Sequence, residues 1–345
     1  MAVTMKQIAD ELGLSIVTVS KAIRNHDDIS RKTRALVMQK VEKLKYRPNL
    51  TARSLVTGRS FLVGLLVPDL LHPFFAEVAR SLGNTLRKEG LYLLICSSEG
   101  DPELERQQLE HLLSRHLDAI VVAPVGADLD ALAMVAESGT PLILLDRKAP
   151  VENAHFVGVN DLMVGKLATL HLISIGCKRI AHLRGPQNSV GERRLEGYKQ
   201  ALASSGMKFF PELVSETSPG DINSTAQGAE RTKKLLSAPR RPDGLFCFND
   251  PLAIGAIDTA LAAGITIPKQ LAIVGCGNLH YDQSLRIPLS SIDQKSAKIG
   301  EHAARIIIDH YAALRMAEEN DLVPSGGVTR IVLRPRLVVR GSTQR

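Results

Sequence analysis

The sequence predicts a small all-α domain at the amino end, followed by an α/β body of two lobes. Three observations lead to this prediction. The first 60 residues show short helical patterns with capping residues and a glycine turn, the rest of the 345-residue chain alternates apolar strands with amphipathic helices, and the excess positive charge lies entirely in the first part. A chain of this length is also too long for one ordinary domain.

The first two helices are predicted from their boundary residues. Thr4 and Gln7 form a T-x-x-Q capping box that starts a helix. Gly13 ends that helix because glycine readily adopts the left-handed conformation of a tight turn. Ser15 can then cap a second helix over about residues 16–24.

A third helix is predicted from after Ser30 to about Leu44, where apolar residues recur at helical spacing. Two short helices joined by a glycine turn form a helix-turn-helix. The small Ala9 allows the two helices to cross closely, and the apolar Val19 holds the second against the first. The alternative is a three-helix bundle with no role in binding DNA.

The charge distribution favours a role in binding nucleic acid. Residues 1–60 contain 12 Lys and Arg against 5 Asp and Glu, whereas the remainder contains 31 of each class. A small basic module on a neutral body is typical of a protein that binds a phosphate backbone. A basic solubilising tail is the weaker interpretation, because this segment has a helical pattern.

Residues 47–59 predict a hinge between the two parts. Pro48 disfavours helix in the residue before it, and Asn49 can cap a short helix that ends near Gly58. A helix this short is unstable in isolation and should form only against a partner or DNA. From the residues alone, a plain flexible linker is an equal alternative.

The body, residues 60–345, alternates strands and helices in the manner of parallel sheets covered on both faces, and its two βαβ halves suggest two lobes. The expected strands are residues 61–67, 91–96, 119–123, 142–145, 156–159, 180–183, 245–248 and 271–274. The expected helices are residues 73–88, 103–115, 129–137, 161–175, 192–205, 223–236 and 251–263. In such sheets ligands bind at the carboxyl ends of the strands.

The stretch from Met5 to Ser60 resembles the headpiece and hinge of the lactose/galactose repressor (LacI/GalR) family. The resemblance implies that the second helix lies in the major groove of operator DNA. It places Ile16 and Val17 at base edges, and Lys21 at the position of the family's usual base-reading arginine, without the rigid fork of that arginine. The expected DNA-contacting residues of the headpiece are Thr4, Ser15, Ile16, Val17, Thr18, Ser20, Lys21 and Asn25, with Thr18 and Ser20 near phosphates.

The resemblance also gives the hinge a function. In the family, two hinge helices of a dimer pair in the minor groove, and a leucine wedges between central base pairs. The matching residue is Leu55, and Arg53 would contact phosphates. With the resemblance, a hinge helix is favoured over a plain linker.

The body resembles the same family's sensor domain, which is itself similar to periplasmic sugar-binding proteins. The segments that carry this likeness are VPDLLHPFF, ILLDRK, GCKRIAHLRGP, RRLEGY, FNDPLAIGA and SSIDQ. It implies a cleft between two lobes, with the chain crossing between them three times. The implied effector contacts are Asp69, Phe74, Asp146, Arg194, Asn249 and Gln294. An aromatic face, two charged groups and two amides can together bind a polar ring.

One departure from the family pattern lies in the loop after residues 271–274. Gly277 occupies the place of an aspartate that often grips sugar hydroxyls, and Asn278 is a possible substitute. The loss of that acid leaves a plain sugar effector less secure. Cys276 beside it is expected to be a buried, inert thiol rather than a redox sensor.

Other classes of protein are disfavoured. The sequence shows no P-loop and no HExxH, and the GxGxxG pattern fails at His280, so we expect neither an enzyme nor a cofactor. Four widely spaced cysteines argue against a zinc site or a disulfide framework. The amino-terminal residues lack the apolar stretch of a signal peptide, so we expect a cytoplasmic, nucleoid-associated protein without a membrane role, not a transport binding protein.

We therefore expect a repressor-like transcriptional regulator that binds a palindromic operator in double-stranded DNA as a homodimer. Its expected domains are a headpiece at 1–46, a hinge at 47–59 and a sensor at 60–345. A small-molecule effector, a carbohydrate or related metabolite, is expected to control its affinity for DNA.

Overall fold

The computed structural model describes residues 3–23, 25–46, 54, 58–126, 129–217, 220, 222–319 and 327–344. The chain divides into two compact units, Met1–Ser60 and Phe61–Arg345. Two residues expected to contact DNA, Arg53 and Leu55, lie outside the described residues. No helix among the described residues is long and apolar enough to cross a membrane.

The first unit contains three helices, α1 (Met5–Leu12), α2 (Ile16–Ile23) and α3 (Arg31–Lys43). Its core consists of Ile8, Ala9, Val19, Ala22 and Val37, all at most 1% exposed. The predicted caps are confirmed, since the hydroxyls of Thr4, Ser15 and Ser30 accept backbone N–H groups three residues on, and the cap after α1 is left-handed at φ +64°.

One detail of the predicted capping box differs. The side chain of Gln7 donates to Glu11 at 3.5 Å instead of returning to the backbone of Thr4. Only half of the reciprocal box therefore forms, because Glu11 is an acceptor one turn further along the same helix face.

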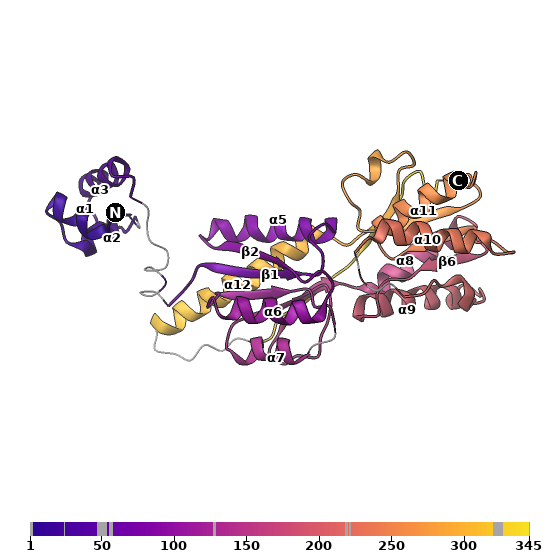
Figure 1. Ribbon diagram of the computed structural model, residues 1–345, viewed down its shortest axis with the longest axis horizontal. Coiled ribbons are helices and arrows are strands. Elements are labelled where there is room, and N and C mark those ends of the chain that lie inside the picture. The colour runs from indigo at the N-terminus through magenta and orange to yellow at the C-terminus, as the bar shows by residue number, and fades with distance from the viewer. Residues whose placement is uncertain are drawn as a thin grey trace. The chain divides into compact units, whose positions relative to one another are not determined.

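The second unit begins with a lobe built on a six-stranded sheet of order β10-β5-β4-β3-β1-β2, in which every pairing is parallel. Its strands are β1 (Leu62–Val67), β2 (Tyr92–Ser97), β3 (Ala119–Val122), β4 (Leu142–Leu145), β5 (His155–Val159) and β10 (Arg330–Leu333). Helices α5 (Pro73–Lys88) and α12 (Ser296–Glu319) cover one face, and α6 (Pro102–Leu113) and α7 (Leu129–Glu137) cover the other (Figure 1).

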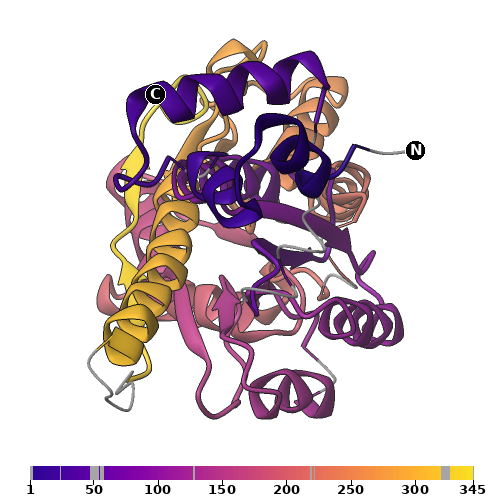
Figure 2. The same cartoon turned by 90° about the vertical axis from the view of Figure 1, so that its left-hand side faces the viewer.

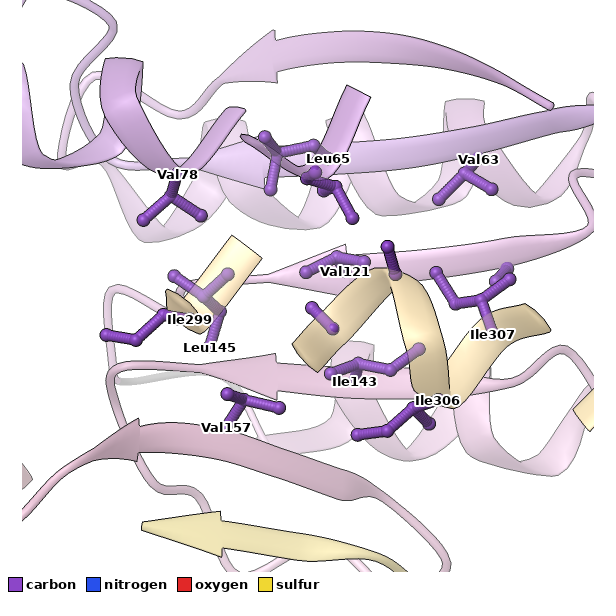
Figure 3. Close-up of a cluster of buried hydrophobic side chains, with 14 of the residues drawn as sticks. Val63, Leu65, Val78, Val121, Ile143, Leu145, Val157, Ile299, Ile306 and Ile307 are labelled. Carbon is purple, nitrogen blue, oxygen red and sulfur yellow. The ribbon is translucent and has the colours of Figure 1, made fainter. Parts of the chain in front are cut away.

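The core of this first lobe follows from the two-residue period of its strands. Val63 and Leu65 of β1 pack with Ile143 of β4 under α5 and α12, where Ile299 and Ile307 meet them (Figure 3). The alternate strand residues point to the opposite face and pack against α6 and α7. Both faces of the sheet are buried, as near-continuous apolar strands predict.

The second lobe is built on a five-stranded sheet of order β11-β9-β8-β7-β6, in which only β11 is antiparallel to its neighbour. Its strands are β6 (Ile180–Leu183), β7 (Gly244–Cys247), β8 (Ala272–Cys276), β9 (Ser290–Asp293) and β11 (Arg336–Val338). Helices α8 (Asp161–Ser174) and α9 (Ser189–Ser204) cover one face, and α10 (Ser224–Ser237) and α11 (Asp250–Ala262) cover the other. Two short 3₁₀ turns, η1 (Pro211–Leu213) and η2 (Asp282–Ser284), complete the lobe.

Among the described residues, one α-helix and three strands were not predicted: β9, α12, β10 and β11. The long helix α12, the golden-yellow helix at the lower left of Figure 2, has apolar residues at helical spacing in Ile299, Ala303 and Ile307. The three strands read SSID, RIVL and RLV, so each contains serine, aspartate or arginine. The four-residue strands β3 and β4, which were predicted, read AIVV and LILL and are apolar throughout. A short segment without a continuous apolar run does not stand out as a buried strand.

Within the described residues, three segments cross between the lobes. They lie between β5 and α8, between β9 and α12, and between β10 and β11. A backbone hydrogen bond of 2.9 Å from Asn160 to Leu333 joins the first crossover to the third. The first and third crossovers therefore lie side by side at the carboxyl ends of β5 and β10.

The helix pairs of the second lobe pack through glycines, and this can be tested at Gly255. A β-carbon there would lie 2.0 Å from the backbone oxygen of Thr225, whereas one at Gly83 in α5 would meet nothing closer than 3.6 Å. Gly255→Ala is expected to lower the free energy of unfolding by about 1–3 kcal/mol or more. Gly83→Ala should leave it unchanged or raise it by up to about 1 kcal/mol. Urea unfolding measures both, and equal effects would contradict the packing.

Candidate DNA-reading helix and effector cleft

The outward face of α2 carries the apolar residues expected to read bases. Ile16 is 47% exposed and Val17 is 63% exposed, while Val19 and Ala22 of the same helix are buried. The outward orientation of Ile16 and Val17 is therefore confirmed. Exposed apolar side chains beside polar ones suit thymine methyl groups in a major groove.

The polar residues of this region have local contacts of their own. Thr4 and Ser15 cap helices, and the hydroxyl of Thr18 lies 2.9 Å from that of Ser15. Asn25 adopts a left-handed φ of +59° in the turn after α2. Each of these residues is placed by the turn geometry before any DNA is present.

Lys21 forms an ion pair with Asp28 that the sequence analysis did not anticipate. The ammonium of Lys21 holds the pKa of the Asp28 carboxyl below its ordinary value, chiefly through their hydrogen bond. Both side chains are well exposed, so the pair is weak and can exchange for another acceptor. A contact between Lys21 and a DNA base or phosphate would therefore compete with Asp28 for the ammonium.

In the second unit, the buried side chain of Arg194 is the centre of the cleft region. Its Nε donates to Asp161 Oδ1 at 2.9 Å, one Nη donates to the backbone oxygen of Phe248 at 2.6 Å, and the other donates to Gln294 Oε1 at 2.5 Å. Arg194 is only 2% exposed, and its guanidinium lies 4.5 Å from the ring centroid of Phe248. Asp161 follows the first crossover and Gln294 lies on the second, so Arg194 connects both.

The charges around Arg194 are held in a buried environment. Burial raises the pKa of Asp161 above its ordinary value, and the nearby Asp146 carboxylate adds to that effect, while Arg194 opposes it. A cavity of about 340 Å³ lies beside Asp146, Asp161 and Ser189. Asp161 was not among the predicted effector contacts. The signal in the sequence is the Asn-Asp pair directly after a strand, which marks the capped start of a helix.

A second contact between the two lobes involves His72 and Asn249. Asn249 caps α11, because its Oδ1 accepts the N–H of Leu252 at 2.9 Å. That orientation leaves its Nδ2 as a donor, 3.2 Å from Nε2 of His72 and 3.3 Å from the hydroxyl of Ser224. His72 precedes α5 in the first lobe, so this contact bridges the lobes. His72 lies within the family-like segment VPDLLHPFF but was not among the predicted effector contacts.

The other predicted effector residues differ in their surroundings and in their contacts. Asp69 is 8% exposed and accepts the N–H of Leu71 at 2.8 Å. Asp146 is also 8% exposed and has a left-handed φ of +63°. Phe74 is 3% exposed, packs in the core of the first lobe and touches Phe75 edge-on, with ring centroids 5.1 Å apart. Arg194, Gln294, Asp146 and Asp161 are thus the residues most clearly brought together.

The space left by Gly277 is occupied by another carboxyl group. A β-carbon at Gly277 would lie 2.6 Å from Oδ2 of Asp250. Asp250 is fully buried, and its other oxygen, Oδ1, accepts a hydrogen bond from the hydroxyl of Ser291 at 2.7 Å. The possible substitute, Asn278, has its side-chain oxygen bonded to Arg340 at 2.6 Å. Cys276 is 1% exposed, and burial raises the pKa of its thiol, as expected for an inert cysteine.

Comparison with known families agrees with this arrangement of units. The model of "Periplasmic binding proteins and sugar binding domain of LacI family" matches residues 60–324, and that of "Bacterial regulatory proteins, lacI family" matches residues 4–49. The chain belongs to the LacI family. It is therefore a DNA-binding transcriptional regulator with a ligand-binding sensor domain, and not an enzyme.

Similar proteins of the LacI family cover the whole chain. The HTH-type transcriptional regulator DegA of Bacillus subtilis (strain 168) is 32% identical over 99% of this chain and 98% of its own. The structure of the transcriptional regulator CelR–cellobiose complex has 27% identity, covers 99% of both chains and gives a TM-score of 0.72. The lac repressor dimer bound to operator and the anti-inducer ONPF, at 21% identity, TM-score 0.83 and 99% coverage of both chains, shares the fold.

The Lys21–Asp28 pair gives a prediction for DNA binding. Asp28→Asn frees Lys21, so it is expected to raise affinity for duplex DNA several-fold at low salt and to steepen the salt dependence. The matched variant Asp27→Asn changes the charge equally without releasing a lysine and should have the smaller effect. Fluorescence anisotropy at several salt concentrations separates the two. Equal gains would show that only net charge matters.

The neighbouring buried carboxyl groups of Asp250 and Asp282 predict how the free energy of unfolding depends on pH. Burial, with the adjacent Asp250, raises the pKa of Asp282 to about 9. An unfolded aspartate titrates near pH ~3.9, so between these values the folded chain binds more protons than the unfolded chain. The free energy of unfolding should therefore carry a contribution that is present at low pH and lost as pH rises toward about 9.

The control for this pH effect is the exposed Asp258. Asp282→Asn should flatten the decline in urea midpoint between about pH 6 and 9, because the amide binds no proton. Asp258→Asn should retain the decline seen in the unmodified chain. A decline of unchanged slope in Asp282→Asn would assign the effect to another group.

Proposed function

We propose that α2 reads a palindromic operator, that the chain acts as a homodimeric repressor, and that the cleft around Arg194 binds a polyhydroxylated, carbohydrate-like effector. The supporting observation is that Arg194 bonds residues of two crossovers at once. A ligand that competes for Asp161 or Gln294 changes how those crossovers are held. The relative orientation of the lobes then depends on the ligand.

The chemistry of the cleft favours a neutral, hydroxyl-rich effector. Asp146 and Asp161 supply acceptors, Asn249 and Gln294 supply amides, and Arg194 is already neutralised by Asp161. Hydroxyl groups both donate and accept, so they match such a mixed set. CelR, a similar regulator, is solved with cellobiose, which supports a carbohydrate class for this chain as well.

A homodimer is supported by an exposed apolar surface on the first lobe. Tyr92 and Ile95 on β2, an outer strand of the sheet, are 54% and 43% exposed, and Leu70 nearby is 49% exposed. They line a groove of about 520 Å³ beside α5. Apolar side chains gathered in this way mark a protein–protein interface. A dimer places two α2 helices on the two halves of a palindrome.

The experiment is footprinting of the full chain on DNA upstream of its own gene, with and without a panel of mono- and disaccharides. Two protected half-sites and a change in operator affinity of about 5–150-fold with one sugar are expected. Asp146→Asn should abolish the response to that sugar while leaving the affinity of the sugar-free protein within about two-fold, and Asp258→Asn should change neither. The absence of any preferred site would refute the operator proposal.

A further inference from the structure

A second cavity lies in the first lobe, at the amino ends of the strands, which is the end of the sheet opposite the crossovers. It has a volume of about 590 Å³, within the range that small ligands fill. It is bounded by α12, by the amino ends of β4 and β5, and by the residues that lead into β10. Leu142, Ile306 and Ile331 give it an apolar wall. None of the expected effector residues lines it.

Three histidines line this cavity: His155 at the start of β5, and His302 and His310 on α12. The N–H of Thr329 donates to Nδ1 of His155 at 3.0 Å, so the neutral ring carries its proton on Nε2. Burial, and then the nearby His310, lowers the pKa of His155, and burial lowers the pKa of His310. His155 is therefore a neutral imidazole with a fixed donor near pH 7. Among the described residues, no cluster of three histidines, cysteines or acids is arranged to hold a metal ion.

The charges on the wall balance each other. Arg305 and Asp309, which have opposite charges, both line the cavity. Arg305 donates to Glu301 at 2.9 Å, and Glu301 also accepts from Lys298 at 2.6 Å, so these two basic and two acidic groups sum to zero. An excess of one sign would favour an ion of the other sign, but here there is none. Flat imidazoles beside an aliphatic wall suit an aromatic ring, and the Nε2–H of His155, whose tautomer the Thr329 contact fixes, suits an acceptor oxygen.

We propose that this cavity is a second small-molecule site, which takes an uncharged aromatic molecule bearing a carbonyl or hydroxyl oxygen. The oxygen accepts from Nε2 of His155, and the ring packs against Ile306 and Ile331. The site is separate from the cleft around Arg194, because it lies at the amino ends of the strands.

A chain of hydrogen bonds connects the cavity to the first residue of the unit. Tyr311, next to His310, donates its hydroxyl to the backbone oxygen of Asp118 at 2.5 Å. The carboxylate of Asp118 accepts the backbone N–H of Phe61 at 3.2 Å. The backbone N–H of Asp118 donates to the backbone oxygen of Leu62 at 2.8 Å. A ligand that shifts α12 thus acts on the segment that follows the hinge. This regulatory part rests on the proposed function, whereas binding to the cavity does not.

The binding test is an NMR titration of the full chain labelled with ¹⁵N-histidine. The probes are benzamide, which is uncharged, and its charged analogues benzoate and benzamidine. Benzamide at millimolar concentration is expected to shift the imidazole resonances of His155 and His310 saturably, and those of the second-lobe His182 and His280 not at all. No saturable shift, or equal shifts from the charged analogues, would overturn the proposal.

Variants assign the donor. His155→Phe keeps a flat ring but loses the N–H, so it should weaken benzamide binding about five-fold, the size expected for one neutral hydrogen bond. The effect is read from the shift of His310. The matched variant His111→Phe, on α6 outside the cavity, should bind as the unmodified chain does. Unchanged affinity in His155→Phe would contradict the assigned donor.

Operator binding tests the regulatory part. Benzamide is expected to change operator affinity in the unmodified chain, and Tyr311→Phe should remove that change while leaving the NMR shifts in place. If benzamide binds without altering operator affinity, the regulatory part is refuted and the site stands. If the chain binds no operator at all, the proposed function fails, and the titration still decides the site.

Discussion

The buried guanidinium of Arg194 is the interaction on which the two-lobed unit depends. A charge removed from water is costly unless it is paired and fully hydrogen-bonded. Arg194 meets that condition only by bonding Asp161, the backbone of Phe248 and Gln294 together. Because two of these partners lie at crossovers, the requirement for satisfied hydrogen bonds also fixes how the chain passes between the lobes.

The lobes themselves have little freedom to deform. Glycines in α8, α9, α10 and α11 let the paired helices touch backbone to backbone, with no space for even a methyl group at Gly165 or Gly228. Such close-packed bodies move as units, so a change of conformation concentrates at the crossovers and at the His72–Asn249 contact between lobes. The response to an effector that we propose for this chain would therefore be a movement of one whole lobe relative to the other.

Features set by neighbouring residues could be predicted from the sequence. The caps at Thr4 and Ser15, the turn at Gly13 and the outward face of α2 all depend on residues a few positions apart. The alternation of strands and helices in the body also followed from local pattern. Helix α12 was not predicted although its apolar residues have helical spacing, and β9, β10 and β11 lack the continuous apolar run that marks β3 and β4.

Contacts between distant residues could not be predicted in the same way. Arg194 meets partners 33, 54 and 100 positions away, and no sequence pattern states which groups will meet. His72 and Asn249 are 177 positions apart, and the Asp250 carboxyl that fills the space at Gly277 comes from another element. The resemblance to a family supplied Arg194 and Gln294 as candidates, and the fold then showed that they bind each other.

A double-mutant cycle between Arg194 and Gln294 tests the central role of this guanidinium most directly. Arg194→Met, Gln294→Ala and the double variant would be compared by the free energy of unfolding in urea. If Arg194 holds the second crossover in place through Gln294, the substitution Gln294→Ala should lower the free energy of unfolding less in the Arg194→Met background than in the unmodified chain. The expected coupling energy is about 1–3 kcal/mol. Effects that add to within about 0.5 kcal/mol would contradict that role.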